Sequence, residues 1–119
     1  MSAPKVLVTG GGGFIGHALI PCLLKAGHDV IASSRDAGTV LPGATLRQVG
    51  ALGPDTDWRA ALDGIDAVVH LAARVHVMNE RAGGAVAENM RINAEGTAAL
   101  ASQAVQAGIK HFIFLSTIK

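Results

Sequence analysis

The sequence TGGGGFIG at residues 9–16 decides the expected fold, because it joins a short apolar run to an apolar segment with helical spacing. The run before it, KVLVT at residues 5–9, is bounded by Pro4 and Gly10 and predicts a buried strand. The segment after it, residues 14–26, predicts a helix that stops at Gly27. A strand, a glycine turn and a helix in this order are typical of the start of a parallel α/β fold.

The glycines of this turn indicate a phosphate-binding function. Gly11, Gly13 and Gly16 fit the pattern G-x-G-x-x-G, and Gly10, Gly13 and Gly16 equally fit G-x-x-G-x-x-G. In either reading one glycine turns the chain sharply, one lets a phosphate approach the backbone, and one lets helix and strand pack closely. The helix N-terminus adds free N–H groups, and a plain flexible turn is the alternative. No Gly-Lys-Ser/Thr ending follows, which excludes a nucleoside-triphosphatase loop.

The remaining chain alternates predicted strands and helices. Because the strands are apolar throughout, they predict a parallel sheet covered on both faces, and right-handed crossovers then give a doubly wound sheet. We predict one Rossmann-type α/β domain over residues 1–119, with strand order 3-2-1-4-5 and an incomplete C-terminal edge. The further predicted strands are 29–33, 45–49, 67–71 and 111–116, and the further helices are 57–62, with an acidic cap, and 86–107.

Composition restricts the partners. The 119 residues are 50% hydrophobic, and ten basic residues face nine acidic ones without any basic block, which argues against nucleic acid as a partner. No apolar run approaches the roughly 20 residues of a membrane span, and the start does not resemble a signal peptide, so we expect a cytoplasmic protein without a membrane partner. The five histidines have no metal-ligand spacing, so no metal site is predicted.

Helical spacing also predicts which side chains are buried. In the first helix Ile15, Leu19, Cys22 and Ala26 share a face, and Cys22 is expected to be a small buried hydrophobe. In the long helix an inward stripe places Asn93 on the apolar face, where a buried amide needs partners. The members of that stripe are Val86, Met90, Asn93, Thr97, Leu100 or Ala101, and Ala104.

Four segments in the right order resemble the extended short-chain dehydrogenase/reductases, the NAD-dependent epimerases/dehydratases. TGGGGFIG is similar to T-G-x-x-G-F-I-G, and DAVVHLAA at residues 66–73 is similar to D-x-V-x-H-x-A-[AG]. NAEGT at residues 93–97 resembles N-x-x-G-T, and FIFLST at residues 112–117 resembles the strand that ends in the catalytic Ser or Thr. HLAARVHVM at residues 70–78 is similar to bacterial nucleoside-diphosphate-sugar epimerases and reductases.

The resemblance implies an NAD(P) site and a catalytic hydroxyl. Thr117 would hydrogen-bond the reacting carbonyl or hydroxyl, with Ser116 nearer the nicotinamide. Asn93 would either hold the floor of the nicotinamide site or tie the helix to strand ends. The remaining implied cofactor contacts are Gly10, Gly13, Phe14, Ile15 and Gly16 at the turn, Leu52 near the adenine, and Leu71, Ala72 and Ala73 after the fourth strand.

The end of the second strand bears on the choice of cofactor. NAD enzymes place an acidic residue there to bind the ribose 2′-hydroxyl. This sequence has Ser34 followed by Arg35, and these can bind a 2′-phosphate that a carboxylate would repel. NADP is therefore favoured over NAD, while Asp36, twenty residues after Gly16, leaves the NAD alternative open.

The general acid/base of the resembled family is a tyrosine in Y-x-x-x-K, and this sequence has no tyrosine. Family spacing places that pair beyond Lys119, so we expect an inactive fragment of a larger enzyme. Ile118-Lys119 stands where the family's dehydratases have Asp-Glu, which favours a nucleotide-sugar epimerase or 4-keto reductase that passes hydride between sugar C4 and nicotinamide. A reductase of a non-sugar carbonyl and a non-catalytic NAD(P) sensor are the alternatives. The bare edge of the fifth strand predicts self-association.

Overall fold

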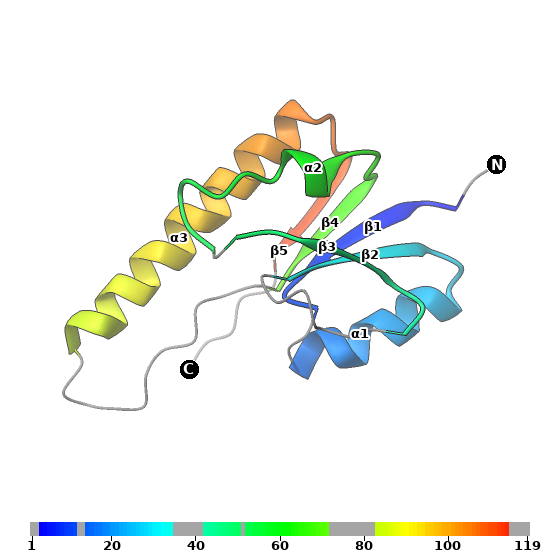
Figure 1. Cartoon of the computed structure of the whole chain (residues 1–119), viewed down its shortest axis with the longest axis horizontal. Coiled ribbons are helices and arrows are strands. Elements are labelled where there is room, and N and C mark those ends of the chain that lie inside the picture. Colours follow the sequence, from blue (N-terminus) through cyan, green and yellow to red (C-terminus); the bar gives the residue numbers. More distant parts are fainter. Residues whose placement is uncertain (1–2, 12–13, 35–41, 51, 72–82, 115–119) are drawn as a thin grey trace.

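Five parallel strands form one sheet in the order β3-β2-β1-β4-β5, which confirms the predicted fold class and strand order (Figure 1). The computed structural model describes residues 3–11, 14–34, 42–50, 52–71 and 83–114. The strands are β1 (Lys5–Thr9), β2 (Asp29–Ser34), β3 (Thr45–Gln48), β4 (Ala67–His70) and β5 (His111–Phe114).

Helices cover both faces of the sheet. Figure 1 shows α1 (Phe14–Lys25) on one face and both α2 (Arg59–Leu62) and α3 (Gly83–Gln106) on the other. α3 begins three residues before the predicted start at Val86, and α2 begins two residues after the predicted start at Asp57. The predicted acidic cap is wrong: the N-cap residue is Trp58, which makes no side-chain capping hydrogen bond. Asp57 lies outside the helix, and its carboxylate accepts the backbone N–H of Arg59 at 3.0 Å.

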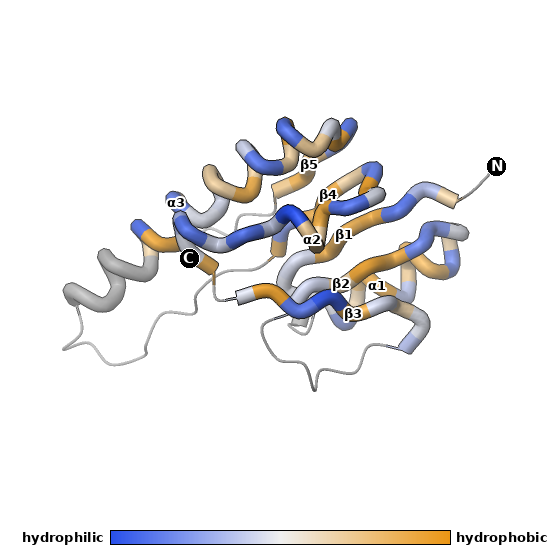
Figure 2. Tube along the Cα trace, turned by 45° about the horizontal axis from the view of Figure 1, so that its top comes forward, coloured by the Kyte–Doolittle hydropathy of each residue, from blue (hydrophilic) through white to orange (hydrophobic). Residues whose placement is uncertain are grey.

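The core has two layers because successive side chains of a strand point to opposite faces. Leu7, Ile31 and Val68 pack with Trp58 and Leu100 on the side of α2 and α3. Val6, Val8, Val30, Ala32 and Val69 pack with Ile20 of α1 on the other side. Figure 2 shows the resulting hydrophobic colour along the central strands. Burial on both faces therefore explains the apolar sequences of β1, β2 and β4, whereas β3 and β5 are only partly covered.

The orientation of α1 differs from the prediction. Ile15 is 40% exposed and Cys22 is exposed, so the predicted inward face and the predicted burial of Cys22 are wrong. The side chains of α1 that pack on the sheet are Leu19, Ile20, Leu23 and Leu24. Most residues of this helix are apolar, so hydrophobic spacing alone does not fix its rotation.

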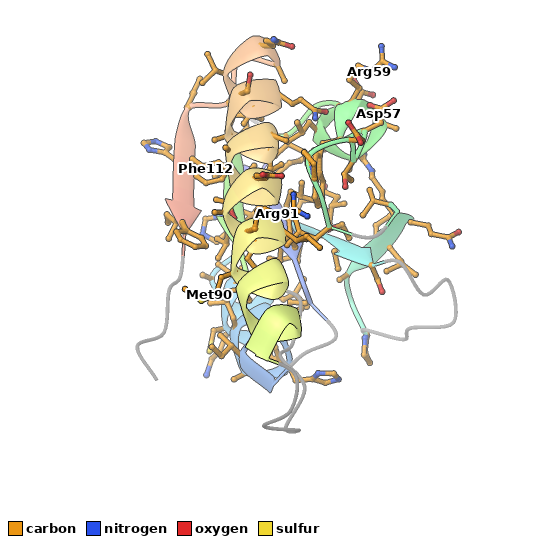
Figure 3. All side chains as sticks on the ribbon, turned by 90° about the vertical axis from the view of Figure 1, so that its left-hand side faces the viewer. Asp57, Arg59, Met90, Arg91 and Phe112 are labelled. Atoms are coloured by element: carbon orange, nitrogen blue, oxygen red, sulfur yellow. The ribbon has the colours of Figure 1, made fainter. Side chains whose placement is uncertain are left out.

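The long helix α3 follows the predicted stripe only in its second half. Leu100 and Ala104 are buried, and Asn93 and Thr97 are half-buried. Met90 is 67% exposed, which contradicts its predicted inward position (Figure 3). Although α3 has 24 residues, no helix among the described residues combines the length and apolarity needed to cross a membrane.

Candidate functional site

The carboxyl ends of β1 and β4 form the topological switch point of the sheet. The chain proceeds from β1 to β2 and β3 on one side and then crosses to β4 on the other. Thr9 at the end of β1 is paired with Ser33 of β2 and with His70 of β4. Gly10, Ser34 and Leu71 therefore leave three neighbouring strands at the same edge. In doubly wound sheets this crevice is where ligands bind.

At the described positions of the glycine turn, the backbone geometry favours glycine. Gly10 has a φ of +69°, a conformation that favours glycine and turns the chain away from β1. A Cβ on Gly16 would lie 2.6 Å from the carbonyl carbon of Gly11, so only glycine lets α1 begin this close to the turn. Gly11 and Gly16 are buried and carry no side chain that could block a ligand. Glycine backbone beside the free N–H groups of a helix N-terminus fits a diphosphate.

A cluster of polar side chains lies directly beneath this turn. We define the switch-point cluster as Thr9, His70 and Thr97. Nδ1 of His70 lies 2.6 Å from Oγ1 of Thr9, and Nε2 lies 3.0 Å from Oγ1 of Thr97. Burial lowers the pKa of His70 from its usual 6.5 to about 4, which keeps the ring neutral at physiological pH. Sequence reasoning missed this cluster, although polar residues in otherwise apolar buried strands were a signal for it.

Leu52, expected near the adenine, lies in the loop after β3 and packs against α3. A Cβ on Gly96 would lie 2.7 Å from Cδ1 of Leu52 and 3.1 Å from the backbone nitrogen of Gly53. Gly96 therefore lets α3 approach this loop closely. Leu52 is half-buried in the cluster of Leu7 and Leu100. Its contact with an adenine ring remains a prediction.

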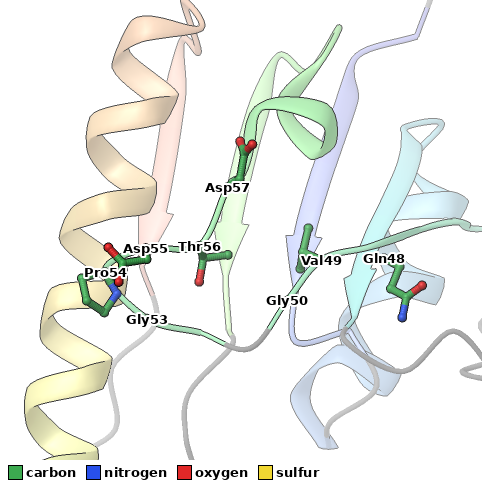
Figure 4. Close-up of a pocket in the computed structure, with 8 residues that line it drawn as sticks. All are labelled: Gln48, Val49, Gly50, Gly53, Pro54, Asp55, Thr56 and Asp57. Carbon is green, nitrogen blue, oxygen red and sulfur yellow. The ribbon is translucent and has the colours of Figure 1, made fainter.

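The same loop lines an open hollow at the end of β3 (Figure 4). Its lining residues are 48–50 and 53–57. The rim carries the carboxylates of Asp55 and Asp57, and the hydrogen bond from the Arg59 side chain lowers the pKa of Asp57 to about 2. Figure 3 shows Asp57 and Arg59 together beside α2. Two carboxylates disfavour phosphate in this hollow.

The described residues cover only part of the predicted site. Ile15 and Gly16 follow the turn on α1, and Asn93 lies one helical turn before Thr97 on α3. Of Phe14 only the backbone is described. Within the described ranges, no three His, Cys, Asp or Glu side chains gather where they could hold a metal ion. The predicted residues that lie outside the described ranges are Gly13, Arg35, Ala72, Ala73, Ser116 and Thr117.

Residues 6–119 match the family model described as the NAD dependent epimerase/dehydratase family. A UDP-glucose 4-epimerase of Vibrio cholerae is 39% identical over 118 residues, which are 98% of this chain and 36% of that protein. A 3-beta-hydroxysteroid dehydrogenase of Mycolicibacterium neoaurum is 34% identical, over 95% of this chain and 32% of that protein.

Solved structures share the same fold. A short-chain dehydrogenase/reductase superfamily protein from Agrobacterium tumefaciens with bound NAD is 31% identical and superimposes with a TM-score of 0.69. The match covers 95% of this chain and 32% of that one. The chain thus spans about a third of the length of the proteins it matches.

Proposed function

Since this chain belongs to the NAD dependent epimerase/dehydratase family, we propose that its glycine turn binds the diphosphate of NAD or NADP. One observation carries the proposal: Gly10 turns the chain at a φ of +69°, and Gly16 leaves no room for a Cβ against Gly11. The first backbone N–H groups of α1 have no partner within the helix, and the helix dipole favours negative charge there. The alternative, a turn that is only flexible, would also be rich in glycine. It would not, however, require Gly16 to lie against Gly11.

Further residues are proposed to contact the rest of the dinucleotide. Ser34, at the end of β2, would hydrogen-bond the adenosine ribose, and Leu71, after β4, would give an apolar surface beside the turn. Leu52 supports the adenine side from the loop after β3, and Asn93 supports the nicotinamide side from α3. Thr117, with Ser116 before it, is the proposed hydroxyl contact to the reacting group. When bound, the nicotinamide supplies hydride transfer, and the protein supplies orientation.

We propose that the whole protein acts on a nucleotide sugar, as a 4-epimerase or 4-keto reductase. The Vibrio cholerae relative, a UDP-glucose 4-epimerase, supports this substrate class. The 3-beta-hydroxysteroid dehydrogenase supports a second candidate, oxidoreduction of a non-sugar hydroxyl or carbonyl on the same scaffold. Turnover of the whole protein with UDP-sugars and with 3β-hydroxysteroids separates the two. Activity on the steroids alone would overturn the nucleotide-sugar proposal.

Titration of this chain with NADH and NADPH, followed by cofactor fluorescence, tests the proposed cofactor site. We expect both to bind and NADPH to bind several-fold more tightly, because Ser34 lacks the charge that would repel a 2′-phosphate. The Agrobacterium tumefaciens protein is known with NAD, so this preference is a prediction specific to this chain. Tighter NADH would contradict it, and absence of binding by either cofactor would contradict the proposed function.

The variant Ser34→Asp tests whether Ser34 sets this preference. Its carboxylate can accept hydrogen bonds from the 2′-hydroxyl of NADH but repels the 2′-phosphate of NADPH. We expect the dissociation constant for NADPH to rise about tenfold while that for NADH changes little. Equal weakening of both cofactors would show that Ser34 does not contact this part of the ligand.

We also propose that the chain associates with itself through β5. This strand is an edge of the described sheet, and its Ile113 and Phe114 are 53% and 52% exposed. An edge strand with unpaired backbone groups and apolar side chains readily pairs with another strand. Sedimentation velocity is expected to show larger species as the protein concentration rises.

Two lysine substitutions make this association test specific. Ile113→Lys places a charge on the β5 edge and is expected to suppress the larger species. Thr45→Lys changes the opposite edge of the sheet, at the start of β3, and is expected to leave them unchanged. A monomer at every concentration, or equal suppression by both substitutions, would refute association through β5.

A further inference from the structure

The switch-point cluster joins three elements through a single enclosed ring. His70 of β4 has no exposed surface, and the ring of Phe114 stacks on it at a centroid distance of 5.5 Å. Buried polar atoms cost free energy unless they are hydrogen-bonded. Both ring nitrogens of His70 have a partner, Thr9 of β1 on one side and Thr97 of α3 on the other. The ring therefore bridges the sheet to the helix above it.

Thr9 is the member that connects this bridge to the glycine turn. Its Oγ1 accepts the N–H of Leu71 at 3.0 Å, and its carbonyl oxygen accepts the same N–H at 3.1 Å. The next residue is Gly10, where the turn begins. The contacts of Thr9 thus set the position of Gly10 relative to both β4 and α3.

We propose that His70 is a positioning residue for dinucleotide binding: by linking Thr9 to Thr97, it holds the start of the glycine turn in place relative to α3. This inference rests on the proposed function of the turn. A neutral imidazole suits the role because it can donate from one nitrogen and accept on the other, and a threonine hydroxyl can pair with either. Enclosed in this way, His70 does not touch the ligand and acts only through Thr9.

The test compares His70→Leu with Val68→Ala, two substitutions at buried positions of β4. Val68 packs in the same layer of the core, two residues before His70, and has no hydrogen bond to the turn through its side chain. We expect His70→Leu to raise the dissociation constant for NADPH about tenfold, as when a buried hydrogen bond is lost. Val68→Ala is expected to lower the melting temperature without changing that constant, measured well below melting.

Two further variants test the hydrogen bonds of His70, and they remain informative if His70→Leu does not fold. His70→Asn has an amide near the position of Nδ1 and can still bond Thr9, but it has no group at the position of Nε2 and loses the bond to Thr97. It is expected to bind NADPH about threefold less tightly than the original chain. Thr9→Val removes the hydroxyl with little change of volume and is expected to weaken binding about tenfold, even if His70→Leu does not fold.

The outcomes separate this inference from the proposed function. If the unsubstituted chain binds neither cofactor, the proposed function fails. If it binds and both His70→Leu and Thr9→Val bind as tightly, only the positioning role is overturned. Equal weakening by Val68→Ala and His70→Leu would also overturn it, because the effect would then follow stability. A His70→Asn variant that binds as tightly as the original chain would exclude a role for the link to Thr97.

Discussion

Gly16→Ala is expected to abolish dinucleotide binding and to lower the free energy of unfolding by about 2–3 kcal/mol. The added methyl group would lie 2.6 Å from both the carbonyl carbon and the Cα of Gly11. These are backbone atoms that also shape the phosphate site, so they cannot yield as a flexible side chain can. Either α1 or the glycine turn must move, and each movement separates the helix N-terminus from the position of the phosphates. Urea denaturation and NADPH titration measure the two effects.

Gly27→Ala is the matched control for this substitution. Gly27 follows the C-terminal end of α1, has a φ of +92°, and would place a Cβ in open space. Alanine at such a φ costs about 1 kcal/mol through backbone strain. We therefore expect Gly27→Ala to lower stability and to leave the NADPH dissociation constant unchanged. Undiminished NADPH binding by Gly16→Ala would show that the close contact with Gly11 is not needed for the site.

Stability is expected to fall as the pH drops from 6.5 to about 4, because His70 is buried in its neutral form. The unfolded chain binds a proton near the usual pKa of 6.5, whereas the folded chain binds it only near the lowered pKa of about 4. The stabilisation is complete above pH 6.5, is lost progressively below it, and levels off near pH 4. Each pKa unit corresponds to about 1.4 kcal/mol, so the loss is on the order of 3 kcal/mol.

Urea denaturation at several pH values measures this loss, and His70→Asn is its control. An amide does not titrate in this range, so the variant should have a flatter stability profile between pH 4 and 6.5. The known contacts of His70 are the hydroxyls of Thr9 and Thr97 and the rings of Phe112 and Phe114, none of which titrates there. Identical pH profiles for the two proteins would refute the assignment to His70.

The strand order and the glycine turn could be predicted because they depend on local features. The apolar runs of β1, β2 and β4 are short, β-branched and buried, and the glycine turn lies directly between a strand and a helix, which is the context that a dinucleotide-binding turn requires. The rotation of α1 could not be predicted, because apolar residues surround most of that helix. In the structure its orientation places Gly16 against Gly11, a contact that involves no side chain.

The switch-point cluster could not be predicted because it depends on the register of two distant strands. Thr9 and His70 are 61 residues apart and meet only because Thr9 pairs with His70 in the β1–β4 register. The packing of Leu52 against Gly96 likewise depends on how α3 lies over the loop after β3. Met90 fits the helical stripe as well as Leu100 does, yet it is exposed. Helical spacing identifies which face of a helix is apolar, but it does not show how much of the length of that face is covered by the rest of the protein.

Backbone amide NMR of this chain during addition of NADP⁺ or NAD⁺ locates the bound dinucleotide residue by residue. If the glycine turn holds the diphosphate, the largest chemical-shift changes will fall on the amides of Gly10, Gly11, Ile15 and Gly16. Saturable changes centred on residues 48–57, with the turn unaffected, would instead place the ligand in the open hollow at the end of β3. That result, or no change at any cofactor concentration, would contradict the proposed cofactor site.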